Sequence, residues 1–163
     1  MKKSLLLDTS IGTSNVGDHI IMECVEQELA PILANAFVFH LPTHVPAFHS
    51  YAIWRNSFAV QNYASCDYKL IGGSNILAKD MRTHYPQWNV NIFNCKPLSG
   101  SVCVGVGAGA GEHTDIYTTH LYRKILSHSF YHSVRDERSK RYVEDVLGLK
   151  AINTGCVTMW ALT

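Results

Sequence analysis

Short runs that are apolar along their whole length recur through this chain, and most are followed by a polar segment with a helical period. The runs lie at residues 4–8, 36–41, 68–77, 101–111, 130–134 and 151–155. Uniformly apolar strands that alternate with helices are typical of a parallel sheet covered on both faces. We therefore expect an α/β fold with a doubly wound, Rossmann-like parallel sheet, in a single domain spanning residues 1–163.

Composition narrows the function classes. The 163 residues are 47% hydrophobic with a formal charge of +1, so the chain can bury a core but has no charge bias toward nucleic acid or anionic membranes. The apolar stretch near the N-terminus is too short for a signal peptide, and no segment reaches the roughly 18 apolar residues of a membrane span. Five scattered cysteines predict reduced thiols. We expect a cytoplasmic protein with no transmembrane segment.

Three segments have helical character. Apolar residues at three- and four-residue steps predict a helix from Asp18 that stops near Pro31. A second helix, holding residues 117–125, follows a Thr114 cap, and a third at 137–147 is closed by Gly148. In doubly wound sheets ligands bind beyond the carboxyl ends of the strands. The turns after the strands are therefore the places to search for a site.

The turn after the first strand contains the sequence SNVGD, with Asn15, Gly17 and Asp18. A glycine here permits a tight turn, and the free N–H groups of a helix start suit a phosphate or carboxylate. Capping of the helix by Asn15 or Asp18 explains the same residues equally well. Both interpretations stay open.

The third strand ends in the sequence IGGSN, which places Gly72, Gly73 and Ser74 at the ligand side of the sheet. Paired glycines permit close approach by a ligand, although a turn alone also accounts for them.

The sequence GVGAGAG invites a dinucleotide-binding hypothesis. Gly105, Gly107 and Ala110 satisfy the G-x-G-x-x-G/A pattern after a strand, and Asp136 stands where a ribose-binding carboxylate belongs. The pattern falls on the fourth strand, whereas the fingerprint normally follows the first. An NAD-dependent oxidoreductase is thus a lesser alternative, and the commoner role of Asp136 is to cap the next helix.

Nine histidines raise the question of a metal, with His40, His44 and His49 closest together. No pair of them has i, i+4 spacing inside a credible helix with an acidic partner, and no thiolate accompanies them. We expect no metal site and no cofactor.

Arg135 directly follows the fifth strand, so its guanidinium is expected on the ligand side of the sheet. A planar guanidinium grips carboxylates and phosphates with two parallel hydrogen bonds. A solvated surface arginine is the competing interpretation.

Five segments taken in order, SNVGDHII, IGGSNIL, GVGAG, HSVRDERSKRYVEDVLGLK and INTGCVTMW, resemble the polysaccharide pyruvyl transferase family. The resemblance runs from about residue 11 to the C-terminus. It implies the N-terminal domain of a two-domain, GT-B-like enzyme that transfers pyruvate as a ketal from phosphoenolpyruvate to a sugar hydroxyl pair. The second domain would be absent from this chain, which would leave it incomplete for catalysis, and Val157 replaces a proline common in the family.

The resemblance also implies roles for residues. Arg135 matches the arginine expected to hold the phosphoenolpyruvate anion. Asn15, Gly17 and Asp18 match the first-loop motif, with Asp18 as an acid/base, and the glycine turn at residues 72–74 matches a lining of the same cleft. No metal or redox cofactor is implied.

The implied partners are phosphoenolpyruvate and a glycan or lipid-linked sugar acceptor. Self-association is an additional expectation, because Trp160 would lie on an exposed half-cleft. The alternative from another class is a stand-alone module that binds a nucleotide or other anion, or a partner chain that completes the cleft.

Overall fold

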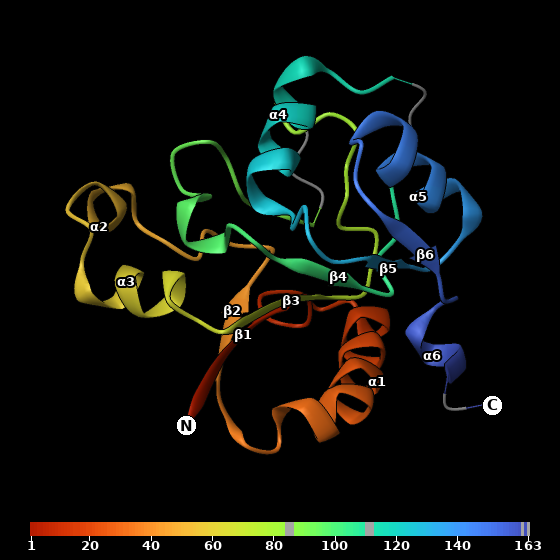
Figure 1. Cartoon of the computed structure of the whole chain (residues 1–163), viewed down its shortest axis with the longest axis horizontal. Helices are drawn as coiled ribbons and strands as arrows, with labels where there is room; N and C mark the ends of the chain where they lie inside the picture. The colour runs from red at the N-terminus through yellow and green to blue at the C-terminus, as the bar shows by residue number, and fades with distance from the viewer. Residues whose placement is uncertain (84–86, 110–112, 161, 163) are drawn as a thin grey trace.

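A four-stranded parallel sheet forms the centre of the computed structural model, which describes residues 1–83, 87–109, 113–160 and 162 (Figure 1). Its strands are β1 (Lys2–Asp8), β2 (Ala36–Pro42), β3 (Tyr68–Gly72) and β4 (Val102–Val104), in the order β2-β1-β3-β4. Every pairing in this sheet is parallel. The expected Rossmann-like α/β fold is confirmed.

Two further strands, β5 (His132–Val134) and β6 (Ala151–Asn153), pair in parallel with each other. β5 lies next to β4, and the backbone N–H of Arg135 donates to the Val106 carbonyl oxygen at 3.1 Å. The strand order reverses between β1 and β3, because β2 lies on one side of β1 and the later strands on the other. The carboxyl ends of β1 and β3 therefore flank the switch point, where ligands bind in such sheets.

Helices cover both faces of the sheet (Figure 1). On one face α1 (Val16–Leu33) buries Met22, Val25 and Leu29 against the strands, and α6 (Val157–Trp160) packs beside it. The opposite face carries α2 (Ser50–Trp54), α3 (Phe58–Ala64), the 3₁₀ turn η1 (Lys96–Leu98), α4 (Ile116–Ile125), α5 (Glu137–Arg141) and the π turn η2 (Tyr142–Val146). Among the described residues, no helix has the length and apolar character needed to cross a bilayer.

Strands β3 and β4 are shorter than the apolar runs predict. Gly73 follows β3 with φ of +52°, and Gly105 follows β4 with φ of +62°. A left-handed residue turns the backbone out of the extended conformation, so each strand stops where its glycine begins. The apolar residues beyond these points continue as irregular chain linked by isolated parallel bridges.

Two helix starts also differ from expectation. α1 begins at Val16 with Asn15 as its cap, ahead of the expected start at Asp18. The predicted Thr114 cap of α4 is wrong, because Asp115 caps the helix and accepts a hydrogen bond from the Thr118 N–H at 2.8 Å. At the other end of the chain, the expected Asp136 cap and the left-handed Gly148 after the third helix are both confirmed.

His132 ties β5 to its neighbours through both ring nitrogens. The ring is fully buried, its Nδ1 lies 3.2 Å from the Cys103 N–H that donates to it, and its Nε2 lies 2.9 Å from the Ser127 carbonyl oxygen. This pattern suits the neutral ring with its proton on Nε2. Burial lowers the pKa of His132 from its usual 6.5. The hydrogen bond to Ser127 raises this pKa but offsets the effect of burial only in part.

This burial predicts a pH-dependent stability. Below pH 6.5 His132 becomes protonated in the unfolded chain but stays neutral in the folded chain. The free energy of unfolding therefore falls as the pH falls, by up to about 1.4 kcal/mol per pH unit. Urea unfolding between pH 7.5 and 5 measures the slope. His132→Gln should flatten it, whereas His19→Gln, at an exposed position, should not. Equal slopes in wild type and His132→Gln would contradict the assignment.

Candidate functional site

Asp18 forms the centre of a polar cluster at the carboxyl edge of the sheet. The first turn of α1 buries its side chain, whose Oδ1 accepts a hydrogen bond from Ser74 Oγ at 2.9 Å. Its Oδ2 accepts from Asn15 Nδ2 at 3.0 Å and lies 3.5 Å from His44 Nε2. One carboxylate thus contacts groups from three separate segments of the chain, the arrangement expected of a positioned acid or base.

Asn15 serves as the helix cap, one of the two interpretations that the sequence leaves open. Its Oδ1 accepts from the Gly17 N–H at 3.1 Å, and its carbonyl oxygen accepts from the Asp18 N–H at 3.0 Å. Two of the first-turn donors of α1 are therefore occupied, and a carboxylate stands beside them. The start of α1 is for both reasons a poor place for an anion.

Gly72 and Gly73 have a packing role at the end of β3. A Cβ on Gly72 would lie 2.6 Å from Met22 Sδ, and a Cβ on Gly73 would lie 2.1 Å from Ile21 Cγ2. Both glycines thus let α1 approach the sheet closely. This close approach is what brings Asp18 to Ser74.

Ser74 has an unusual backbone for a residue with a side chain. Its φ is +58°, and it is buried. The hydroxyl lies 2.9 Å from Asp18 Oδ1 and 2.9 Å from Gln87 Oε1, while the carbonyl oxygen accepts from the Gly107 N–H at 2.7 Å. Left-handed conformations of non-glycine residues are uncommon, and they concentrate at functional sites.

Arg135 lies over Gly107, at the end of β5. A Cβ on Gly107 would lie 2.5 Å from Arg135 Nε and 2.3 Å from Asn75 Oδ1, so any larger residue there would displace both side chains. Arg135 Nε also pairs with Asp136 Oδ2 at 3.4 Å, and the arginine side chain is 30% exposed. The guanidinium is therefore held in place on the ligand side of the sheet and still reaches solvent, as a residue that grips an incoming anion requires.

Asp136 is held in its charged form by its neighbours. Burial by itself would raise the pKa of this carboxyl, but the hydrogen bonds from Ser139 and the charge of Arg135 lower it overall. Its Oδ1 accepts from the Ser139 N–H at 2.7 Å, which is the capping contact. Asp136 thus fixes both the start of α5 and the arginine before it.

Asn75 connects the two halves of the site. Its Oδ1 is buried with no hydrogen-bond partner among the described residues, and it points at the same glycine that Arg135 covers. A buried, unpaired amide oxygen is costly unless a ligand or water completes it. Since Ser74 and Asn75 are consecutive, one turn joins the Asp18 cluster to Arg135.

The sequence did not reveal four of these residues as site members: His44, Asn75, Gln87 and Gly107. His44 was considered only as a metal ligand, and Gly107 only as part of a dinucleotide pattern. Asn75 carried a usable signal, because it directly follows the glycine turn at a strand end. The other three reach the site through long-range packing, which leaves no local trace.

The dinucleotide hypothesis gains no support from this geometry. Gly105 faces α6, where its Cβ would lie 2.3 Å from Val157 Cγ1, rather than an open phosphate site. Asp136 is engaged with Ser139 and Arg135. The third position of the pattern, Ala110, lies outside the described residues.

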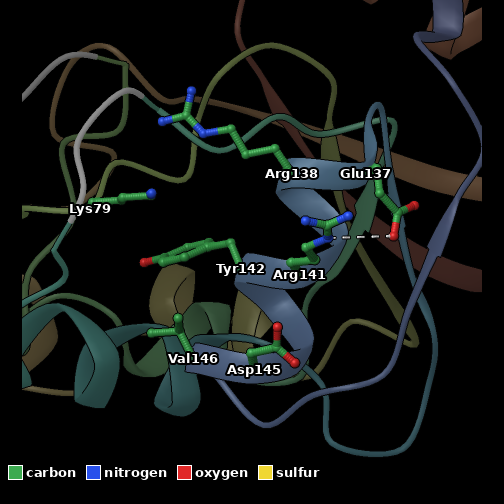
Figure 2. Close-up of a pocket in the computed structure, with 7 residues that line it drawn as sticks. All are labelled: Lys79, Glu137, Arg138, Arg141, Tyr142, Asp145 and Val146. Atoms are coloured by element: carbon green, nitrogen blue, oxygen red, sulfur yellow. Dashed lines mark ion pairs between the residues drawn. The ribbon is translucent and has the colours of Figure 1, made fainter.

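A separate hollow of about 370 Å³ lies along α5 and η2 (Figure 2). Its lining mixes both charges and comprises Lys79, Glu137, Arg138, Arg141, Tyr142, Asp145 and Val146. Lys79 Nζ sits 5.7 Å from the centre of the Tyr142 ring, and Arg141 Nε pairs with Glu137 Oε1 at 4.0 Å. Neither Asp18 nor Arg135 lines this hollow, so it is distinct from the cluster described above.

A family model described as polysaccharide pyruvyl transferase matches residues 15–163, a range that includes both Asp18 and Arg135. No curated protein sequence and no solved structure matches the chain.

Proposed function

The chain belongs to the polysaccharide pyruvyl transferase family, and from that premise we propose that, together with a second domain that completes the cleft, it transfers pyruvate from phosphoenolpyruvate to a pair of hydroxyls on one sugar. The product is a ketal, and the acceptor is a glycan or lipid-linked precursor in the cytoplasm. Donor and acceptor meet at the carboxyl edge of the sheet, between Asp18 and Arg135.

The chemistry sets two requirements for this site. A proton must reach the methylene carbon of phosphoenolpyruvate, which makes the adjacent carbon cationic and open to attack by a sugar hydroxyl. Phosphate then leaves, and the second hydroxyl closes the ketal. Each hydroxyl loses its proton as it attacks: one proton balances that taken up by the methylene carbon, and the other leaves with the phosphate. The site therefore needs a cation for the donor's carboxylate and phosphate, and an acid/base within reach of the reacting carbons.

Arg135 supplies the cation in this proposal. The observation that carries it is the placement of the guanidinium over Gly107 on the ligand side of the sheet, with the arginine side chain 30% exposed. A guanidinium held by packing loses little freedom on binding, so it acts as a preorganised anion clamp. The neighbouring Asn75 Oδ1 is an acceptor, so in this proposal it receives a hydrogen bond from a hydroxyl of the sugar rather than from the anion.

Asp18 supplies the acid/base. Its carboxylate contacts Asn15 and Ser74 by hydrogen bonds and lies 3.5 Å from His44 Nε2. The imidazole gives a route by which a proton can be exchanged with Asp18. Ser74 and Asn15 orient the carboxylate, while Gly17, Gly72 and Gly73 let α1 and the turn take the required conformations.

The proposal is tested by thermal-shift titration of the chain with phosphoenolpyruvate, NADH and a nucleotide-sugar in parallel. A ligand that binds only the folded state raises its stability, so phosphoenolpyruvate should raise Tm. Arg135→Ala should weaken that binding by about 30-fold or more, the cost of losing a hydrogen-bonded contact between opposite charges. The matched control is Arg141→Ala, which removes the same charge from the exposed side of α5.

Each departure from this result has a definite meaning. A phosphoenolpyruvate shift that survives in Arg135→Ala would reject the clamp. Loss of the shift in Arg141→Ala instead would place the anion in the hollow of Figure 2. A shift with NADH or nucleotide-sugar alone would favour a Rossmann-like binding module over a pyruvyl transferase.

A further inference from the structure

We propose that Asp8, Glu26 and His40 form a binding site for a divalent transition-metal ion, separate from the Asp18 cluster. Asp8 ends β1, His40 lies in β2, and Glu26 projects from the middle of α1. One ligand atom from each residue lies within 4.8 Å of the other two. The three residues are far apart in sequence, which is why spacing rules bring in His40 as a candidate ligand but not its two carboxylate partners.

The separations are those that a bound ion would impose. His40 Nδ1 lies 3.3 Å from Asp8 Oδ2 and 3.6 Å from Glu26 Oε1. With metal–ligand bonds of about 2.1 Å in a tetrahedral arrangement, two ligand atoms stand roughly 3.4 Å apart. Both measured separations match this value. Glu26, half exposed on the helix surface, has room to adjust the third.

The charges in this cluster also favour a cation. Two carboxylates converge on one imidazole nitrogen, and a single N–H can satisfy only one of them. Asp8 is buried, and its Oδ1 is occupied by the N–H and hydroxyl of Ser10, at 2.8 and 2.6 Å. Its Oδ2 is thereby directed at the cluster. An ion between the three groups would contact all of them at once.

The donor set indicates the class of metal. One imidazole nitrogen with two carboxylate oxygens suits Zn²⁺ and Mn²⁺ rather than a soft thiophilic ion. Because His40 and Glu26 are partly exposed, water can fill the remaining positions. The ion would also hold Asp8 and Ser10, where the loop leading to Asn15 begins.

The test uses the full chain after chelator treatment and titrates it calorimetrically with MnCl₂ and then ZnCl₂. We expect one equivalent of either metal to bind. His40→Ala and Glu26→Gln should each weaken binding at least about tenfold. The controls His19→Ala and Glu23→Gln remove the same groups from exposed positions of α1 and should bind as the wild type does.

The readout separates this site from others. Mn²⁺ bound here should broaden the imidazole signals of His40 in NMR spectra and leave those of His128 sharp. Absence of Mn²⁺ and Zn²⁺ binding, or equal binding by wild type and Glu26→Gln, would overturn the proposal and leave an ion pair between histidine and carboxylates. Glu26 is exposed, so its variant should fold even if His40→Ala does not, and circular dichroism checks this.

Discussion

Replacing Asp18 by asparagine should lower the rate of pyruvyl transfer about 10²- to 10⁴-fold, the range that a positioned acid/base contributes. Asparagine keeps the size of the side chain but cannot carry the proton. In the wild type, Asn15 Nδ2 donates a hydrogen bond to the Asp18 carboxylate. In the variant, the side-chain amide can place a second N–H donor against Asn15 Nδ2. Phosphate released from phosphoenolpyruvate by the protein with its second domain, with a panel of sugars that offer hydroxyl pairs, measures the rate.

The affinity for phosphoenolpyruvate separates this chemical role from a structural one. If Asp18 acts on protons while Arg135 holds the anion, Asp18→Asn should change kcat far more than donor affinity. Asp145→Asn is the control, because it removes an exposed carboxylate that lines the hollow of Figure 2. A full rate in Asp18→Asn would remove Asp18 from the mechanism and leave His44 as the nearest candidate.

Gly73→Ala should destabilise the fold by about 2–5 kcal/mol. The new Cβ would lie 2.1 Å from Ile21 Cγ2, and Ile21 cannot swing aside because a β-branched side chain in a helix has essentially one rotamer. Overpacking of this kind costs about 1–3 kcal/mol. The left-handed backbone, with φ of +52°, adds about 1–2 kcal/mol for a residue with a side chain.

Gly100→Ala isolates the backbone part of this cost. Gly100 has φ of +86°, but a Cβ there meets nothing within 4 Å. Urea unfolding of the two variants, provided that their m-values agree, compares their free energies of unfolding. Gly73→Ala should lose roughly 1–3 kcal/mol more than Gly100→Ala. Equal losses of unfolding free energy in the two variants would mean that α1 can move away from the new Cβ at Ile21 with little energetic cost. The close approach of α1 to β3 would then not be a fixed feature.

The parallel sheet was predictable because burial on both faces makes its strands apolar throughout. This property can be recognised in each segment without knowledge of the others. The ends of those strands were less predictable. The run at 68–77 continues with Ile76 and Leu77, which are also buried, so hydrophobicity alone gives no reason to stop at Gly72. The left-handed Gly73 decides the boundary, and a glycine in a sequence does not state its φ.

The residues of the candidate site also differ in how far the sequence predicts them. Asp18 and Arg135 could be proposed from the sequence because each lies directly beside a predicted strand or helix end. The role of Gly72 and Gly73 could not be read from sequence, because a glycine pair has the same letters whether a ligand or a helix fills the space above it. At α4, Thr114 and Asp115 are neighbouring residues that both cap helices well, and only the contact with Thr118 distinguishes them.

The turn at Ser74 and Asn75 makes the two halves of the site mechanically dependent. Ser74 contacts Asp18 through its hydroxyl and Gly107 through its carbonyl oxygen, while Asn75 shares the space above Gly107 with Arg135. If an anion draws the guanidinium toward it, we expect Asn75 to move as well, and its neighbour Ser74 is the residue that hydrogen-bonds to the Asp18 carboxylate. By thermodynamic reciprocity, whatever free energy donor binding contributes to ordering Asp18 is matched by the effect of an ordered Asp18 on donor binding.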